Sequence, residues 1–206
     1  MEHAFRRSAI WRIGVPCLVG LIGLAALGAS TDGSSGIPWS EVPITWSLFR
    51  GAPPADAVHR SEAAAIHMTI AWHASYSAGS RGDAWTGQVD RVTVSNAMDT
   101  DLSWVVPGGA TEQVLRHEQG HFDLNEVYRR KLEIVLSCVR AQSATKDGVL
   151  DALYAAVHAR ANEVLAALQV AQHRYDAESD HGNNPAGQAR WASHIAAWLR
   201  DPAAAP

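Results

Sequence analysis

The chain has 206 residues, of which 47% are hydrophobic and 18% are charged, and these proportions are typical of a globular protein rather than a disordered one. This length is sufficient for one domain with a substantial core. The formal net charge of −4 excludes the basic surface that a nucleic-acid partner requires, so we expect no nucleic acid to bind.

The N-terminal segment has the pattern of an export signal. Arg6, Arg7 and Arg12 precede an apolar run from Ile13 to Ala29 that ends in small residues. A positive stretch followed by an apolar one is typical of a signal peptide, and a run of this length is also close to what a membrane anchor needs. We therefore expect residues 1–30 to be a signal peptide or an N-terminal anchor, and the protein to be periplasmic or secreted.

A Ser- and Gly-rich stretch follows, and we interpret residues 31–42 as a linker. The predicted domain then spans residues 43–200. Cleavage of the leader would remove Cys17 and leave Cys138 as the only cysteine, which excludes an intrachain disulfide.

The first part of the predicted domain is rich in strand patterns. Residues 44–49 are a short β-prone run, and the alternation of apolar and polar residues from Ile66 to Ser77 predicts a strand with one buried face. Further strands are expected at residues 87–98 and 102–106, with a turn at residues 99–101 between them. Together these segments predict a small antiparallel sheet.

The second part of the domain is predicted to be helical. One long helix should run from Thr111 to about residue 141, and a second from Asp147 to about residue 180, with an apolar stripe along its length. Asn184 followed by Pro185 favours the start of a third helix. The predicted fold class is therefore α+β, with a small antiparallel β-sheet followed by two long helices and a C-terminal helix.

The most informative motif lies in the first long helix, where His117-Glu118-Gln119-Gly120-His121 reads His-Glu-x-x-His. Residues four apart lie about one turn apart on one face of a helix, so both imidazoles can reach one metal ion. Zinc takes nitrogen ligands in this way, and the glutamate stands beside the first ligand, where it can accept a proton from a metal-bound water. The glycine is a poor helix former, which indicates that another element packs closely there.

Two histidines leave zinc without the third protein ligand that a catalytic site normally has. Candidates concentrate near the end of the second long helix, and helix geometry leaves Asp176, Glu178 and His181 all open. A straight hairpin of the two helices would place residues 169–173 opposite the motif instead, so His173 is an outside candidate.

Three neighbours of these residues have alternative interpretations. Asp123 lies on another side of the helix from the ligands and is best interpreted as a structural hydrogen-bond acceptor. Asn125 lies on the ligand face and either orients a ligand or lines the cleft. Tyr175 either donates a hydrogen bond to an oxyanion or packs in the core.

The two segments together resemble a bacterial family of unknown function that is described as predicted secreted zinc-dependent proteases. The resemblance rests on His117-Glu-Gln-Gly-His-Phe-Asp123 and Tyr175-Asp-Ala-Glu-Ser-Asp-His-Gly182, with Ser103-Trp104-Val105 and Gln188-Ala-Arg-Trp191 fitting the same pattern. It covers about residues 43–197.

The resemblance implies zinc on His117 and His121, and we expect the helix that carries them to be a zincin-like active-site helix. We choose His181 as the third ligand, with Glu178 as the next choice and Asp176 after it.

The expected function is that of a zinc-dependent metallopeptidase, a hydrolase in which the resemblance makes Glu118 the catalytic base. Its partner would be a protein or peptide substrate, with membrane contact only through an uncleaved N-terminal segment. The alternative is a non-catalytic envelope module that binds a partner, with zinc structural or absent. Hydrolysis of a non-peptide amide, for example in the cell wall, is a third and weaker hypothesis.

Overall fold

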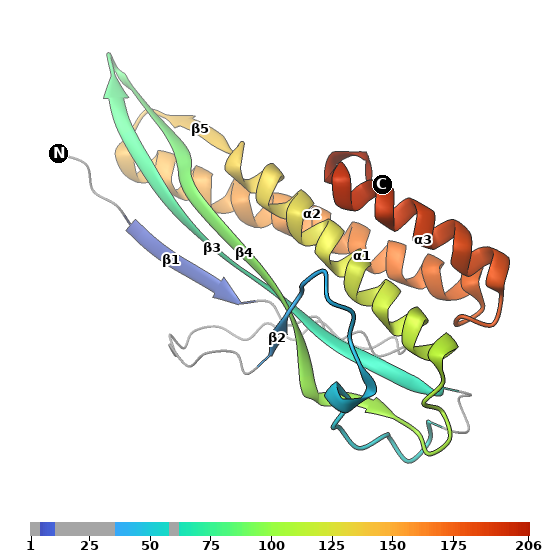
Figure 1. The fold of residues 1–206 in the computed structure, drawn as a ribbon. Coiled ribbons are helices and arrows are strands. Elements are labelled where there is room, and N and C mark those ends of the chain that lie inside the picture. Colours follow the sequence, from blue (N-terminus) through green and yellow to red (C-terminus); the bar gives the residue numbers. More distant parts are fainter. Residues whose placement is uncertain (1–4, 11–35, 58–61) are drawn as a thin grey trace.

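The computed structural model describes residues 5–10, 36–57 and 62–206 of the chain. In this part of the chain, an antiparallel sheet forms one layer, and helices α1 (Glu112–Ser137) and α2 (Lys146–Ser179) lie along one of its faces (Figure 1). Helix α3 (Pro185–Arg200) packs against both α1 and α2. The predicted α+β class, with an antiparallel sheet followed by long helices and a C-terminal helix, is confirmed.

A long hairpin of two strands dominates the sheet (Figure 1). The described strands follow the order β1-β3-β4-β2, and β5 also pairs with β4, always in antiparallel fashion. Their bounds are Phe5–Ile10 for β1, Ile37–Pro38 for β2, Ala64–Arg81 for β3, Ala84–Val105 for β4 and Arg140–Ser143 for β5.

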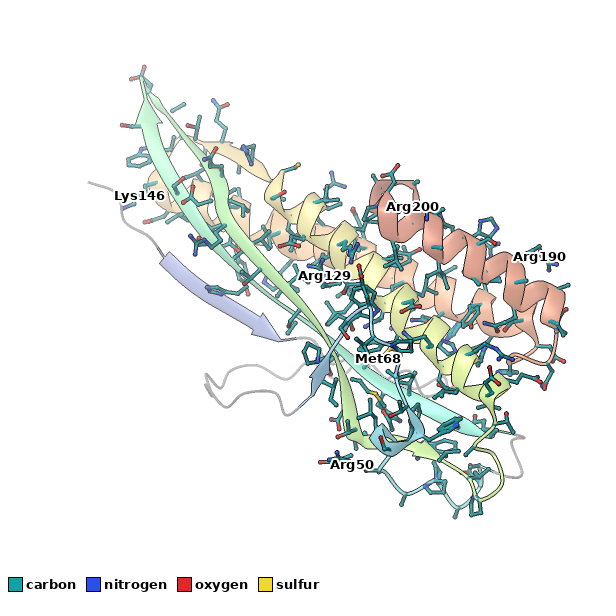
Figure 2. All side chains as sticks on the ribbon, viewed as in Figure 1. Arg50, Met68, Arg129, Lys146, Arg190 and Arg200 are labelled. Carbon is teal, nitrogen blue, oxygen red and sulfur yellow. The ribbon has the colours of Figure 1, made fainter. Side chains whose placement is uncertain are left out.

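Strand β3 confirms the prediction from alternating residues, and it is longer than the predicted strand at both ends. Every second side chain along it is buried, because successive side chains of a strand point to opposite faces of a sheet. The buried residues are Ile66, Met68, Ile70, Trp72, Ala74 and Tyr76. Figure 2 shows side chains filling the space between the sheet and the helices, with Met68 contributing from the sheet.

Strand β4 is one continuous strand, so the predicted turn before Leu102 is wrong. The segment is an irregularity within the strand instead, where the carboxylate of Asp99 accepts hydrogen bonds from the backbone N–H groups of Asp101 and Leu102. The register against β3 shifts at this point, between Ala65 and His67. A side chain that caps local backbone groups produces the same sequence signal in a bulge as in a turn.

The β-prone run at residues 44–49 is also not a strand. It forms a short 3₁₀ helix, η1 (Trp46–Leu48), whose aromatic residue Trp46 packs against Phe49 with ring centroids 4.8 Å apart. Apolar content alone did not distinguish a strand from a segment that contains a short turn of helix.

The helices begin as the sequence predicts, each at a residue whose side chain accepts a backbone hydrogen bond from the first turn. These N-cap residues are Thr111 for α1, Thr145 for α2 and Asn184 for α3. Helix α1 ends at Ser137, earlier than predicted, because residues 140–143 leave the helix and pair with β4. The chain closes with a short 3₁₀ helix, η2 (Pro202–Ala204).

The main core lies between the helices and the sheet. The apolar stripe predicted for α2 supplies many of its buried residues, although Tyr154 on that stripe is largely exposed. The buried members of the stripe are Leu153, Val157, Ala161, Val164, Leu165, Leu168 and Tyr175.

The N-terminal predictions are tested only in part. Residues 5–10, inside the predicted leader, pair with β3 as strand β1, whereas the apolar run at residues 13–29 lies outside the described residues. The predicted linker, residues 31–42, is described from Gly36 onward, and its strand β2 pairs with β4. No described helix has both the length and the apolar character that crossing a membrane requires. The export segment and the domain boundaries therefore stay predictions.

The core predicts a clear difference between two substitutions on α1. Leu132 is 0% exposed and Ile134 is 46% exposed. Leu132→Ala should lower the free energy of unfolding by about 2–5 kcal/mol because it removes buried methyl groups and leaves a cavity, whereas Ile134→Ala should cost less than about 1 kcal/mol. Urea denaturation followed by circular dichroism measures both, and equal losses would contradict the assignment of the core.

Candidate metal centre

Three buried side chains converge between α1 and α2. The Nε2 atoms of His117 and His121 are 3.1 Å apart. One carboxylate oxygen of Asp176 lies 3.2 Å from Nε2 of His117 and 2.9 Å from Nε2 of His121. The three residues are 4%, 7% and 7% exposed, and within the described part of the chain they form a group that could hold a metal ion.

The donor atoms fit one divalent metal ion. The three donor atoms lie 2.9–3.2 Å from one another, close enough that they would share one ion such as zinc, whose bonds to nitrogen and oxygen are about 2 Å long. Two imidazoles and a carboxylate are also donors that zinc and related metals accept. Two ring nitrogens and a buried carboxylate oxygen therefore form a group that could hold a metal ion.

Helix α2 reaches this site because it runs antiparallel to α1. Gln172 contacts His121, and Asp176, one turn further along α2, contacts His117. The simple hairpin expectation, which places residues 169–173 opposite the motif, thus holds for Gln172. His173 is exposed on another side of α2 and is not in the group.

Asp176, the last of the three alternatives for the third ligand, is the one that the structure brings to the histidines. His181 has a side chain that is 58% exposed, with Nδ1 3.7 Å from the Asp176 carboxylate, and it lies outside the group. Glu178 also lies outside, because it pairs with Arg174 at 2.9 Å and accepts a hydrogen bond of 2.9 Å from the indole of Trp191. A ligand role for His181 stays a prediction.

The turn after α2 explains where His181 lies. Helix α2 ends at Ser179, and the next three residues have positive φ angles of 50°, 50° and 85° at Asp180, His181 and Gly182. Such angles suit glycine but are uncommon for residues with side chains. The left-handed backbone carries His181 off the helix face on which Asp176 lies.

His121 and Asp176 shift each other's pKa values. Burial alone would lower the pKa of His121, but the facing Asp176 carboxylate, with smaller contributions from Glu118 and Gln172, raises this pKa to about 9. Burial opposes ionisation of Asp176, yet the two imidazoles hold the pKa of its carboxyl well below the usual range. Before a metal binds, the pair is therefore an imidazolium and a carboxylate at neutral pH.

Glu118 is fixed beside the ligands by the sheet. Its Oε2 accepts a hydrogen bond of 2.9 Å from the backbone N–H of Ile66 on β3, and both residues are buried. Ile66 lies at the register shift between β3 and β4. The irregularity of the sheet thus supplies the N–H group that holds the glutamate of the motif.

Gly120 confirms the expectation of a closely packed element. A Cβ atom at this position would collide with the hydroxyl of Tyr175 on α2. Tyr175 is fully buried, its ring is stacked on that of His117 at 4.7 Å, and its hydroxyl donates to the His117 carbonyl at 3.1 Å. Burial raises the pKa of this tyrosine. Of the two interpretations of Tyr175, the structure supports the buried core residue.

The neighbours of the motif have structural partners. Asp123 accepts hydrogen bonds from the indole N–H of Trp39 at 2.8 Å and from the amide of Gln119 at 2.7 Å, as expected of a structural acceptor. Burial raises the pKa of Asp123. Asn125 donates to the side chain of Asn96 on β4 at 2.7 Å, so it joins α1 to the sheet and does not orient a ligand.

Two glutamines beside the histidines were not among the residues predicted for the site. Oε1 of Gln172 lies 2.6 Å from Nδ1 of His121, and Oε1 of Gln188, on α3, lies 3.3 Å from Nδ1 of His117. The available signals were the position of Gln172 one turn before Asp176 and the place of Gln188 in the Gln-Ala-Arg-Trp segment. Glutamine is a common neutral polar residue, so neither signal was strong enough to predict a role at the site.

The fold and this site define an α+β protein with a buried His-His-Asp group that could bind a metal ion. Residues 47–182 match the family described as bacterial protein of unknown function (DUF922), and the chain belongs to this family. Membership confirms the bacterial family of unknown function that the motifs suggested.

Curated relatives match over a shorter stretch. The chain is 33% identical over 99 residues to the mannonate dehydratases of Brucella canis and Brucella suis, a stretch that covers 47% of this chain and 24% of each relative. It is 35% identical over 97 residues to the mannonate dehydratase of Brucella melitensis biotype 2, which covers 46% of this chain and 23% of that relative. The chain thus spans about a quarter of the length of these relatives. No solved structure matches the chain.

The contact at Gly120 predicts that an added methyl group is harmful. Gly120→Ala should lower the free energy of unfolding by about 1–3 kcal/mol through the collision with Tyr175, although alanine inside a helix normally adds about 1 kcal/mol of stability. The control is Gly79→Ala, where a Cβ atom meets nothing within 4 Å. Thermal unfolding measures both, and a more stable Gly120→Ala protein would contradict the packing.

The raised pKa of His121 predicts that metal binding releases a proton. With a pKa of about 9, His121 is protonated at neutral pH and must lose this proton before Nε2 can bind a metal ion. The apparent affinity for zinc should rise about tenfold per pH unit up to about pH 9, and about one proton should leave per ion. Calorimetry in buffers of different ionisation enthalpy counts the protons, and an enthalpy independent of the buffer would contradict the shift.

Proposed function

We propose that this protein is a zinc-dependent metallopeptidase that hydrolyses peptide bonds with Glu118 as general base. The observation that supports the proposal is the convergence of His117, His121 and Asp176, with Glu118 held beside them on the same helix. One turn of α1 thus supplies two candidate ligands and one candidate base, and α2 supplies the third ligand.

The number of ligands favours a catalytic centre over a structural one. Catalytic zinc typically has three protein ligands, often two histidines and a carboxylate, and keeps an open position, whereas structural zinc has four protein ligands. The group formed by the described residues has three members. His181 is the nearest further imidazole that the sequence predicted, and its ring is mostly exposed.

The residues around the centre have separate tasks in the proposed reaction. His117, His121 and Asp176 would hold the zinc ion, which would act as a Lewis acid on a carbonyl group and make a water molecule acidic near neutral pH. Glu118 would accept a proton from the attacking water and return it to the leaving amine. Asp176 faces both imidazoles and would offset the positive charge of the ion.

Strand β3 offers a place for an extended peptide beside Glu118. The N–H of His67 points toward Ser103 on β4, and neighbouring N–H groups of a strand alternate in direction, so that of Ile66 points away from β4 and toward Glu118. Of the described strands, β1 pairs with this outer edge only at residues 71–76. The remaining edge lies next to the proposed base and suits pairing with a peptide backbone.

Two other functions have weaker support. A non-catalytic envelope module that binds a partner would not need Glu118 beside an open metal position. The dehydratase activity named for the Brucella relatives is not proposed here, because the chain matches only 24% of the length of those proteins. Export to the periplasm or secretion remains part of the proposal on the N-terminal sequence pattern.

The test is the substitution Glu118→Gln. It should lower the rate of casein cleavage by at least about 10²-fold, because the amide cannot accept a proton, while zinc remains bound. Glu112→Gln, on the same helix with a side chain that is 85% exposed, is the matched control and should leave the rate unchanged.

Metal content measured with and without a chelator completes the experiment. Removal of the metal should abolish cleavage in the wild type and in the control. Cleavage by Glu118→Gln at the wild-type rate would show that the mechanism is wrong, and a wild type that binds zinc but cleaves nothing would favour the envelope module.

A further inference from the structure

We propose that Gln172 and Gln188 are positioning residues that hold both imidazoles of the centre in the tautomer whose Nε2 is free to bind a metal ion. The inference rests on the metal centre of the proposed function. It assigns a task to two side chains that do not themselves contact the ion.

Gln172 makes two hydrogen bonds to the same residue of α1. Its Nε2 donates to the backbone carbonyl of His121 at 3.1 Å, and its Oε1 lies 2.6 Å from Nδ1 of that residue. A carbonyl oxygen can only accept, so the NH₂ end of the amide must face it and the oxygen must face the ring. An amide oxygen can only accept as well, and Nδ1 of His121 must therefore carry the hydrogen.

Gln188 holds the hydrogen of His117 on Nδ1 in the same way, and Tyr175 fixes the orientation of its amide. The tyrosine hydroxyl donates to the His117 carbonyl at 3.1 Å, so its oxygen accepts the amide hydrogen of Gln188 at 2.6 Å. Oε1 of Gln188 then faces Nδ1 of His117 at 3.3 Å, and this nitrogen must also donate. The hydroxyl of Ser179 lies near the same nitrogen at 3.5 Å, at the limit of a hydrogen bond.

Both rings therefore have their hydrogen on Nδ1 and their Nε2 directed at the centre. In neutral imidazoles, these two Nε2 atoms would face each other at 3.1 Å with a lone pair each, beside the Asp176 carboxylate. Three acceptors at such distances repel one another unless a cation lies between them. By holding both hydrogens on Nδ1, the glutamines leave three acceptor atoms facing one another, and a proton or a metal ion between them relieves the repulsion.

The amide is suited to this task because it is neutral and has both a donor and an acceptor. A carboxylate at position 172 could accept from Nδ1 of His121 but could not donate to its carbonyl, and it would add a negative charge to a buried centre. Gln172 is fully buried, so its two bonds are made without competition from water.

The experiment compares substitutions that remove or keep the acceptor. Gln172→Met and Gln188→Met keep the approximate volume but remove both hydrogen bonds, and each should weaken zinc binding about 10- to 100-fold. Gln188→Glu keeps the acceptor for Nδ1 of His117 at a partly exposed position and should bind zinc more tightly than Gln188→Met. Gln169→Met, an exposed position on α2, is the matched control and should bind as wild type.

Two readouts separate positioning from a general loss of structure. Zinc affinity is measured by competition with a chromophoric chelator, and histidine ¹H–¹⁵N correlation spectra of the zinc-loaded protein report which ring nitrogen carries hydrogen. In the wild type, His117 and His121 should each show a hydrogen on Nδ1, and the Met variants should lose the slow exchange of the corresponding Nδ1 hydrogen. Circular dichroism shows whether each variant is folded, and Gln188, which is partly exposed, provides the test if Gln172→Met does not fold.

The outcomes distinguish this inference from the proposed function. Wild-type zinc affinity in folded Met variants at both positions would overturn the positioning role and leave the metal centre intact. A hydrogen on Nε2 of either ring in the zinc-loaded wild type would also overturn it. A wild type that binds no zinc would overturn the metal centre and this inference together, whereas zinc binding without casein cleavage would contradict only the peptidase function.

Discussion

The carboxylate of Asp176 between two imidazoles is the interaction on which the site depends. It joins α2 to the turn of α1 that carries His117 and His121, and it does so in the interior, where an unpaired charge would be costly. The surrounding contacts serve this arrangement. Tyr175 packs against Gly120 and stacks on His117, so the two helices approach closely at the motif. The absence of one methyl group thus sets the distance between the elements that carry the ligands.

The sheet contributes to the site through an irregularity. Where the register of β3 against β4 shifts, the N–H of Ile66 turns to Glu118 and fixes the carboxylate beside the histidines. Helix α3 contributes through Gln188, which contacts both His117 and Tyr175. Each layer of the fold therefore provides one group that orients a residue of α1, and the site can form only when all of these layers are in place.

Local patterns were enough to predict the parts of the structure that depend on local physics. Alternation predicted β3, Asn184 followed by Pro185 predicted the start of α3, and spacing predicted that His117 and His121 converge. The third ligand could not be predicted in the same way, because it depends on how far α2 is displaced along α1. Strand β5 interrupts the predicted helix and pairs with β4, so the connection between the two helices differs from the straight hairpin that the sequence suggested. Sequence preferences near residue 140 carry no information about a partner strand more than fifty positions earlier, and Gln172 and Gln188 carry no charge that would have marked them.

The hydrogen bond from Trp39 to Asp123 has a consequence for the way this protein is prepared for experiments. The indole belongs to the segment that composition assigned to a linker, yet its partner is a half-buried acid two positions beyond His121. A shortened polypeptide that starts at residue 43 would lack this indole, and Asp123 would keep only the Gln119 amide as its donor. Weak metal uptake by such a fragment would therefore reflect the missing tryptophan rather than a defect of the ligands.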